Sequence, residues 1–456
     1  MKYLLLFVLI ANQVLTAQNL TDSTKKPLVH YFQNGKMNGL WRNFFMFTDN
    51  EKGLMDFGAL ATGLLVNYKT LPFKNFYISV GFSSVGNLWS QNLTAQDPTT
   101  KQRSRYEMGL YDVSNPNNYR SILLMTDLAL NYQKNNWKAT LGKQLIRTTF
   151  INPQDGRMVP TLVEGFYIQK QEKNWDFELG YLYGIAPRGV AKWYSVGQSI
   201  GVYPQGVQTN GKTSQYAQNT YSNGIFLIGL QKKLWNFLFI KVHNLYTDNV
   251  MNTSFLQFDV YKNDTANNSQ WTLSGQLIRQ DGIGNGGNLD ESKRYFPKNG
   301  KSMTFGGKIQ WENLNWSLSL NYNRITALGR YLIPREWGIE PFFTFIPRER
   351  SDGFADAHAL ALKSNFLFNK SWKISFQSTY VKLPYVKNFA HNKYGMPSYW
   401  QNNLEIRFLP KGFFRNLEIM GLLVYKHNIG ETDGEKRFII NRTNMFQWNF
   451  ITNYKF

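Results

Sequence analysis

The chain has no cysteine, no long apolar run after its first residues, and few acidic side chains. Without cysteine it can carry neither a lipid anchor attached through cysteine nor a thiolate metal site. Without a later stretch of about 20 apolar residues, it is not expected to cross a membrane as helices. Its 30 Asp and Glu stand against 51 Lys and Arg, which gives a formal net charge of +21.

The first residues have the pattern of an export signal. Met1 and Lys2 precede an apolar run over residues 4–10, and Ala17 suits a cleavage site. The apolar run is too short for a membrane anchor helix, and polar residues follow it. We therefore predict a signal peptide over residues 1–17, a polar segment over 18–38 and one domain over 39–456.

The last residues of the chain alternate between aromatic and polar side chains. In an extended strand, alternate residues lie on opposite faces of a sheet. One predicted face carries Phe446, Trp448, Phe450, Tyr454 and Phe456. The other predicted face carries Gln447, Asn449, Asn453 and Lys455. An aromatic outer face and a polar inner face, ending in a terminal Phe, are typical of the closing strand of an outer-membrane barrel.

Short turns rich in Lys and Asn, each followed by tryptophan, recur along the chain. These tryptophans are Trp137, Trp175, Trp235, Trp316 and Trp372. Each turn lies between alternating segments of about 8–11 residues, the length that a tilted strand needs to cross a bilayer. Tryptophan at the same end of successive strands indicates an interfacial girdle, and the aromatic content of 16% is enough for two girdles.

The pattern predicts an all-β fold, a transmembrane antiparallel β-barrel of about 18 strands with short periplasmic turns and long extracellular loops. The predicted strands are 41–48, 56–68, 76–85, 122–132, 137–147, 162–169, 175–183, 224–231, 237–246, 255–261, 271–279, 302–311, 316–325, 358–368, 372–381, 400–408, 417–425 and 445–456. The predicted long loops are 86–121, 147–161, 184–223, 280–301, 326–357, 382–399 and 426–444. A soluble sandwich or propeller would also alternate, but the asymmetry of loop lengths and the turn tryptophans favour the barrel.

The positive charge needs an interpretation of its own. Nucleic-acid binding is one reading of such a charge, but the basic residues are spread along strands and loops rather than gathered in a tail or one helix. We therefore predict no nucleic-acid partner, and a cationic lumen that faces anionic solutes. Strand parity predicts inward-facing side chains at Arg42, Lys308, Lys363, Lys373, Arg407 and Lys426. Such residues can replace the water that a carboxylated solute sheds in a narrow pore.

One local segment, residues 141–166, carries a more specific signal. It has a strand with Gly-Lys-Gln near its end, a loop with Asp155 and Arg157 before a proline, and Glu164-Gly165 at the start of the next strand. With the early segment 41–45, this pattern resembles the OprD family of substrate-specific outer-membrane porins.

The resemblance implies that loop 147–161 folds inward and narrows the pore. Arg157 matches a loop arginine of the family that joins a ladder of basic wall residues, and Arg147 is a further pore-lining candidate at the start of the loop. Asp155 and Glu164 belong to the same constriction, and a salt bridge from Arg157 to either of them would serve only the loop shape. Both roles of Arg157 remain open and are compatible.

The resemblance also implies passive uptake of small water-soluble nutrients, many of which carry carboxylates. The later strands depart from the family, because the clustered C-terminal arginines are reduced here to Arg407 beside Glu405, with Lys426 and Arg442 apart. The expected function is therefore a porin for small, anionic or carboxylate-bearing solutes. An outer-membrane adhesin or surface-binding barrel that acts through its extracellular loops is the alternative.

No enzyme motif lies in the structural context that its chemistry requires. Residues 282–287 match the dinucleotide pattern G-x-G-x-x-G, but no helix is expected after them. A hydrolase pair of Asp356 and His358 lacks an identifiable nucleophile. We predict no enzyme activity, no cofactor and no metal. The expected partners are small-molecule solutes, outer-membrane lipid, lipopolysaccharide and the barrel-assembly machinery, for a monomer or homotrimer in the outer membrane of a Gram-negative bacterium.

Overall fold

The computed structural model describes residues 27–456 except 116, 118–120 and 155–156. The predicted signal peptide 1–17, residues 18–26 of the polar segment 18–38 and the candidate residue Asp155 therefore lie outside the described residues. Within the described part of the chain, no helix is long and apolar enough to cross a membrane.

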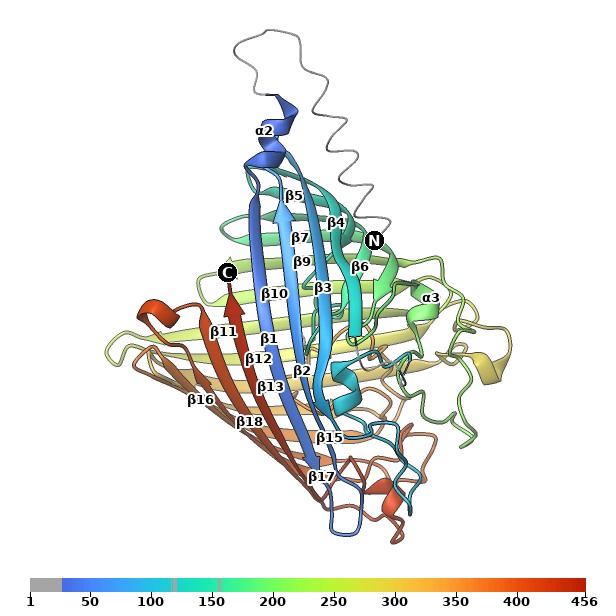
Figure 1. Cartoon of the computed structure of the whole chain (residues 1–456). Helices are drawn as coiled ribbons and strands as arrows, with labels where there is room; N and C mark the ends of the chain where they lie inside the picture. The colour runs from blue at the N-terminus through green and yellow to red at the C-terminus, as the bar shows by residue number, and fades with distance from the viewer. Residues whose placement is uncertain (1–26, 116, 118–120, 155–156) are drawn as a thin grey trace.

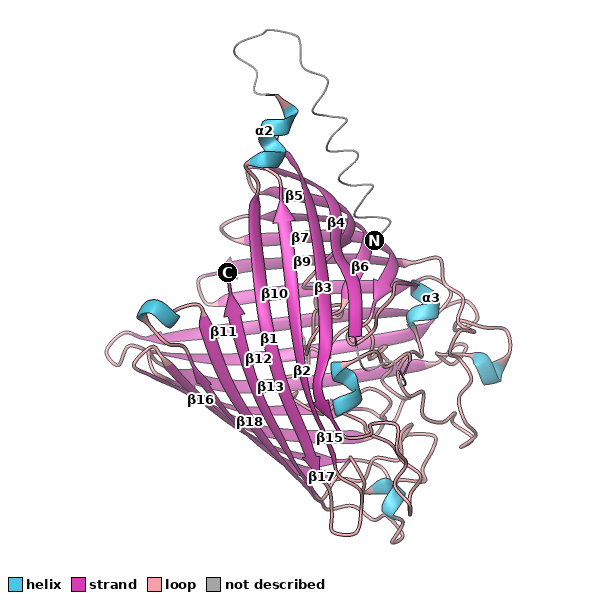
Figure 2. Ribbon diagram, viewed as in Figure 1, coloured by secondary structure: helices cyan, strands magenta, loops and turns pink. Residues whose placement is uncertain are grey.

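The described strands form one closed antiparallel barrel of 18 strands, with one short additional strand (Figures 1 and 2). The strands of the ring are β1 (Lys36–Asp49), β2 (Phe57–Lys69), β3 (Phe76–Ser90), β4 (Ser121–Lys134), β5 (Trp137–Gln144), β6 (Leu162–Gln171), β7 (Trp175–Ala186), β9 (Ile225–Trp235), β10 (Leu238–Thr247), β11 (Met251–Asp264), β12 (Ser269–Gly282), β13 (Lys301–Glu312), β14 (Trp316–Ile325), β15 (Ala357–Phe368), β16 (Trp372–Lys382), β17 (Tyr399–Phe408), β18 (Leu417–Asn428) and β19 (Met445–Lys455). The first and last strands close the ring, with Leu40 opposite Lys455 and Asp49 opposite Phe446. The predicted fold class is confirmed.

The remaining elements are short. The extra strand β8 (Tyr194–Ser195) pairs with the end of β7, while β9 takes the place beside β7 in the ring. The helices are α2 (Leu28–Gln33), α3 (Val196–Ser199), η1 (Glu107–Leu110), η2 (Glu291–Lys293), η3 (Gly412–Phe414) and η4 (Lys436–Phe438). The sequence analysis anticipated neither α2, which precedes β1, nor β8, which has only two residues and so shows no alternation.

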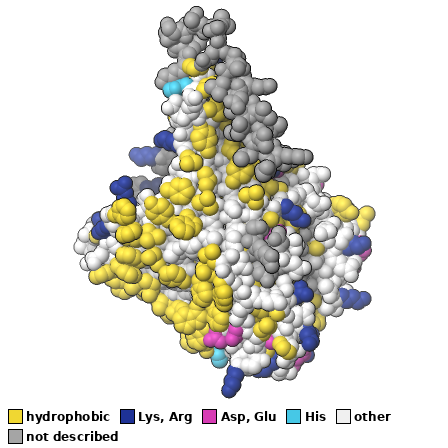
Figure 3. Space-filling model, viewed as in Figure 1, with side chains coloured by type: hydrophobic (Ala, Val, Ile, Leu, Met, Phe, Trp, Pro, Cys, Tyr) yellow, Lys and Arg dark blue, Asp and Glu magenta, His cyan; other side chains and the backbone are white. Residues whose placement is uncertain are grey.

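The two faces of the barrel wall differ in polarity along the closing strand. Phe446, Trp448 and Phe450 are each about half exposed, at 46%, 47% and 51%. Gln447 and Asn449 between them are buried. An apolar band of this kind covers much of the surface in Figure 3, and it is what a barrel presents to lipid. The predicted alternation of this strand is confirmed.

Local backbone chemistry explains the short turns. Asn369 and Lys370, which join β15 to β16, both have positive φ of 53° and 54°. The backbone N–H of Ser371 donates to the carbonyl of Phe368 at 3.2 Å, which closes a turn with these two residues at its centre. A turn of this kind needs positive φ at both central positions, and Asn adopts it more readily than most residues. The tryptophans that follow short turns, among them Trp137, Trp316 and Trp372, begin β5, β14 and β16 and are exposed at the same end of the barrel.

The long connections lie at the other end of the strands, and several fold into the barrel (Figure 1). Their apolar side chains form a buried cluster inside the ring rather than on its outer face. Phe150, Tyr331 and Trp337 are fully buried members of this cluster. The interior core at this end is therefore built by loops, and it narrows the lumen.

Candidate functional site: a constriction in the lumen

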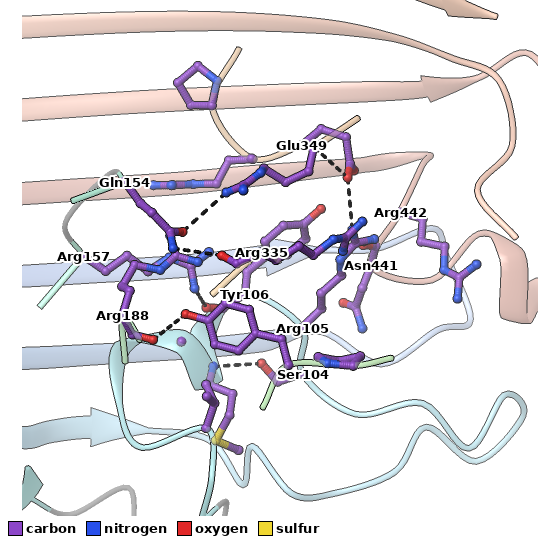
Figure 4. A pocket seen from close by; sticks show the side chains of 18 of the residues that line it. Ser104, Arg105, Tyr106, Gln154, Arg157, Arg188, Arg335, Glu349, Asn441 and Arg442 are labelled. Carbon is purple, nitrogen blue, oxygen red and sulfur yellow. Dashed lines mark hydrogen bonds and ion pairs between the residues drawn. The ribbon is translucent and has the colours of Figure 1, made fainter. Parts of the chain in front are cut away.

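A cavity of about 750 Å³ lies among these inward-folded loops and the wall of β1, β17, β18 and β19. Of the described residues that line it, ten are Lys or Arg and two are Glu, so basic side chains outnumber acidic ones on its lining. Carboxylates just behind the lining pair with three of these arginines: Asp352 with Arg335, Glu340 with Arg350 and Glu418 with Arg407. The basic residues are Lys101, Arg103, Arg105, Arg157, Arg188, Arg335, Arg348, Arg350, Arg407 and Arg442. Figure 4 shows several of them converging from different loops.

Arg157 and Arg42 meet at the edge of the cavity. Arg157 is only 6% exposed, and its Nη1 donates to the carbonyl of Tyr106, 2.5 Å away. Arg42 Nη1 donates to the carbonyl of Arg157, and Arg42 Nε donates to Asn453 Oδ1 at 2.7 Å. These hydrogen bonds link Arg157 of the loop to Arg42 of the wall, the two arginines that the sequence analysis named. The acceptors in these bonds are backbone carbonyl oxygens and one side-chain amide oxygen.

A second loop, residues 326–356 between β14 and β15, enters the lumen and contacts the predicted constriction loop. Asn152 Nδ2 donates to the carbonyl of Ile339 at 3.1 Å, and the backbone N–H of Asn152 donates to the carbonyl of Trp337 at 3.1 Å. Gln154 Nε2 donates to the carbonyl of Arg335 at 2.9 Å. The two loops therefore form one inserted unit.

Loop 326–356 reaches across the lumen to distant strands. The carbonyl of Pro347 accepts from Gln401 Nε2 at 2.7 Å and from Asn403 Nδ2 at 3.1 Å, both on β17. Two residues before Pro347, the carbonyl of Phe345 accepts from Lys363 Nζ on β15 at 2.6 Å. The predicted pore residue Lys363 thus holds this loop by its backbone.

Glu349 is the acidic centre of the loop. Its carboxylate lies 2.6 Å from Lys426 Nζ and 3.1 Å from Arg105 Nη2, and all but 4% of the side chain is buried. Burial alone would raise the pKa of Glu349, but the charges of Arg105, Lys426 and Arg335 outweigh it and lower the pKa to about 2. The predicted residue Lys426 is itself fully buried and binds this carboxylate.

Two further arginines belong to the same wall. The Arg335 guanidinium stacks 3.8 Å from the ring centroid of Tyr394 and lies 3.1 Å from the Asp352 carboxylate. Arg442 Nη1 donates to the carbonyls of Tyr394 and Gly395, at 2.6 Å each. Burial lowers the pKa of Arg442 to about 10, so the guanidinium stays charged at neutral pH.

Apolar side chains share the cavity with the arginines. Phe44, Met420 and Ile451 line it from β1, β18 and β19. Arg348 lies 5.8 Å from the Phe44 ring centroid, and its Nη2 donates to Asn449 Oδ1 at 2.9 Å. A bound molecule would therefore meet guanidinium groups beside an apolar surface.

Charges balance differently at Arg407 on β17. Its guanidinium lies 3.0 Å from Glu405 and 2.9 Å from Glu418, and both Arg407 and Glu405 line the cavity. Lys373 stands opposite Arg407 in the strand register and is exposed. Arg407 is therefore matched by two carboxylates here.

The other sequence-predicted residues are dispersed. Lys308 Nζ lies 5.5 Å from the ring centroid of Phe343, in the loop that crosses the lumen. Glu164 pairs with Lys143 across β5 and β6. Arg147 is exposed just after β5 and does not line the cavity.

Asp356 and His358, the pair considered for a hydrolase, do not hydrogen-bond to each other. Asp356 pairs with Arg324, and His358 Nδ1 lies 2.8 Å from the hydroxyl of Tyr322. The described residues also contain no group of three or more His, Asp or Glu side chains placed to hold a metal ion.

Sequence reasoning missed most of the cavity arginines. Arg335, Arg348 and Arg350 come from loop 326–356, and Arg105 comes from the loop before β4. The available signal was the pair Arg348 and Arg350, with Arg335 earlier in the same long predicted loop.

A lysine ties several loops together above the cavity. Lys393 Nζ lies 2.9 Å from the Tyr216 hydroxyl and 4.7 Å from its ring centroid. The ring centroids of Tyr295 and Tyr394 lie 5.1 and 5.3 Å away. Burial lowers the pKa of Lys393 to about 8. Three different loops therefore contribute to one buried contact.

No protein-family model and no curated protein matches the chain. Solved structures do match. OpdK of Pseudomonas aeruginosa with vanillate is 11% identical and has a TM-score of 0.69, over 93% of this chain and 99% of that chain. Acinetobacter baumannii OccAB2 is 10% identical, with a TM-score of 0.70 over 94% and 99%. Pseudomonas aeruginosa OccK2 (OpdF), in complex with glucuronate, is 11% identical, with a TM-score of 0.66 over 93% and 98%. The chain therefore has the barrel fold of the OprD/Occ outer-membrane porins, as the resemblance over residues 141–166 led us to expect.

Proposed function

We propose that this chain is a porin of the OprD type that lets small carboxylate-bearing solutes diffuse across the outer membrane of a Gram-negative bacterium. The observation that carries the proposal is the cavity in the lumen, which ten basic and two acidic side chains line among the residues that the structure describes. The fold shared with OprD/Occ porins supports a channel rather than an enzyme.

The proposed mechanism is that side chains of the lumen replace the water that a solute loses on entry. A carboxylate that enters the narrow lumen loses part of its water shell, and planar guanidinium groups can replace that water with paired hydrogen bonds. Arg157, Arg348 and Arg442 offer such groups from three different loops. Several weak sites in one passage let the solute enter and also leave.

The apolar lining selects for the rest of the solute. Phe44, Met420 and Ile451 can contact a ring or a short carbon skeleton while the carboxylate lies against Arg348. Small organic acids therefore fit this wall better than inorganic anions, because they gain apolar contact as well as charge pairing.

The test is the reversal potential of the purified protein in planar bilayers under a salt gradient. We expect open channels that prefer anions, and a weaker preference in Arg348→Met. The matched control is Lys212→Met, which removes an exposed basic residue outside the cavity. Cation preference, or equal shifts in both variants, would contradict the cationic constriction.

The adhesin alternative keeps one specific observation. The loops at the mouth are joined by Lys393, Tyr216 and Tyr295 into a compact cover. If that cover closes the lumen, bilayers will show no current. Loss of surface binding after deletion within residues 205–215 would then favour the adhesin.

A further inference from the structure

A second cavity lies in the wall of the barrel, away from the arginines. It has a volume of about 210 Å³, and no residue that lines it also lines the first cavity. Its lining comes from β2, β3, β4, β5 and the residue that follows β5. Lys69 ends β2, and Lys138 lies at the start of β5, beside the short turns. The cavity therefore faces the end of the lumen opposite the inserted loops.

Asp127 is the fixed acceptor of this second cavity. Its Oδ1 accepts from Ser79 Oγ at 2.6 Å, and its Oδ2 accepts from Asn67 Nδ2 at 2.9 Å. Each carboxylate oxygen has two lone pairs, so each can accept one more hydrogen bond. Two neighbouring hydroxyl groups of a solute can supply them together.

A buried amide and hydroxyl hold this arrangement. Asn131 Nδ2 donates to Ser79 Oγ at 3.0 Å, and Thr140 Oγ1 donates to Asn131 Oδ1 at 2.9 Å. Asn131 is 4% exposed and Thr140 is 5% exposed, so both are held in place by packing. The network links β3, β4 and β5, and it fixes the orientation of the groups that face the cavity.

The same cavity also contains two cations. Lys69 and Lys138 both line it, and both are exposed to the lumen. In the part of the chain that the structure describes, neither ammonium group takes part in a hydrogen bond or ion pair. They are placed to receive an anionic group close to the Asp127 acceptor.

We infer that this cavity is a second solute site, which binds a carboxylate that also carries neighbouring hydroxyl groups, as in the sugar acids. The inference rests on the proposed porin function and adds a recognition step below the constriction. The carboxylate of the solute binds Lys69 and Lys138, and a pair of its hydroxyl groups donates to Asp127. A plain carboxylate of the same length lacks the second set of contacts.

The experiment compares two solutes with six carbons and one carboxylate. Gluconate carries hydroxyl groups and hexanoate carries none. Each is added to the short-turn side of the full-length protein in planar bilayers, and the concentration that halves the ion current is measured. For the wild type we expect block at a lower concentration of gluconate than of hexanoate. In Asp127→Asn, the gluconate concentration that halves the current should rise about tenfold, because a charged acceptor makes stronger hydrogen bonds than a neutral one.

Asp259→Asn is the matched control. Asp259 also accepts from a serine hydroxyl, Ser274 Oγ at 2.5 Å, and from an amide, Gln257 Nε2 at 2.9 Å, but it lies on β11 outside the second cavity. The substitution Asp259→Asn should leave the gluconate concentration that halves the current unchanged. The second site is refuted if Asp127→Asn and Asp259→Asn shift the gluconate block equally, or if hexanoate blocks as well as gluconate.

The two proposals can fail separately. If Arg348→Met weakens block by both solutes while Asp127→Asn does nothing, the porin stands and the second site is wrong. If the protein passes no current, the porin proposal fails. Calorimetric titration of the refolded protein with gluconate then decides the second site, since only binding that Asp127→Asn weakens would support it.

Discussion

Lowering the pH is expected to release loop 326–356 from the barrel wall by protonating Glu349. The pKa of this carboxyl is about 2 in the closed structure, against an ordinary value of 4.5 for an exposed glutamate. A carboxyl whose pKa is depressed stabilises the closed state above its ordinary pKa, and that stabilisation is lost as the pH falls toward the depressed value. The loop should therefore loosen between pH 4.5 and 2.

The size of the effect can be worked out in two ways. The difference between the two pKa values corresponds to roughly 3 kcal/mol, because one pKa unit is about 1.4 kcal/mol. Removing one partner of a buried ion pair costs about 3–5 kcal/mol, because the other charge is left unpaired. The buried partner here is Lys426, which lies 2.6 Å from the carboxylate. Both estimates give a free-energy change that is large enough to convert a mostly closed loop into a mostly open one.

The assay is single-channel recording at pH 6, 4 and 3. Wild-type channels should show more frequent events of larger conductance as the pH falls, because loop 326–356 occupies the lumen. Glu349→Gln should show such events already at pH 6, with little further change on acidification. Asp290→Asn, which alters an exposed carboxylate on another loop, should behave as the wild type. The reasoning is refuted if Glu349→Gln keeps the wild-type dependence on pH.

Three further substitutions test other parts of the structure. A Cβ at Gly109 would overlap the Arg157 guanidinium, so Gly109→Ala should weaken the anion preference in reversal-potential measurements. Gly421→Ala is the control, because a Cβ at Gly421 meets open space and should leave the preference unchanged. Trp337 is fully buried, and Trp337→Ala should cost about 3–5 kcal/mol and speed proteolysis of its loop in the refolded protein; an unchanged rate would contradict its anchoring role. Leu320 is 49% exposed on the outer face, and Leu320→Lys should destabilise the barrel by about 2–4 kcal/mol in denaturant titrations from lipid vesicles, an effect that would be absent if this face met water.

The wall of the barrel was predictable because its pattern is repeated and local. Each strand alternates with period 2, and several short turns carry their own Asn or Lys at positive φ, as at Asn369. The closing strand could be read from Phe446 and Trp448 alone, since their exposure follows from their parity. Such signals require no knowledge of distant contacts.

The path of loop 326–356 could not be read in this way. It is held by backbone carbonyls, at Pro347 by Gln401 and at Phe345 by Lys363, and a carbonyl leaves no trace in the sequence. Parity did identify Lys363 and Lys426 on the wall. It could not show that they contact the loop, because that depends on residues far away in the chain.

These contacts separate the roles of the basic residues in a way that net charge does not. Lys363 and Lys426 on the wall are engaged by the backbone and the carboxylate of loop 326–356, whereas Arg348 and Arg442 line the cavity and contact amide or carbonyl oxygens. The wall lysines therefore position the loop, and the loop arginines present the charge. Ion preference should consequently depend on how loop 326–356 is held, because a displaced loop carries its arginines with it even though the formal charge of the chain stays the same.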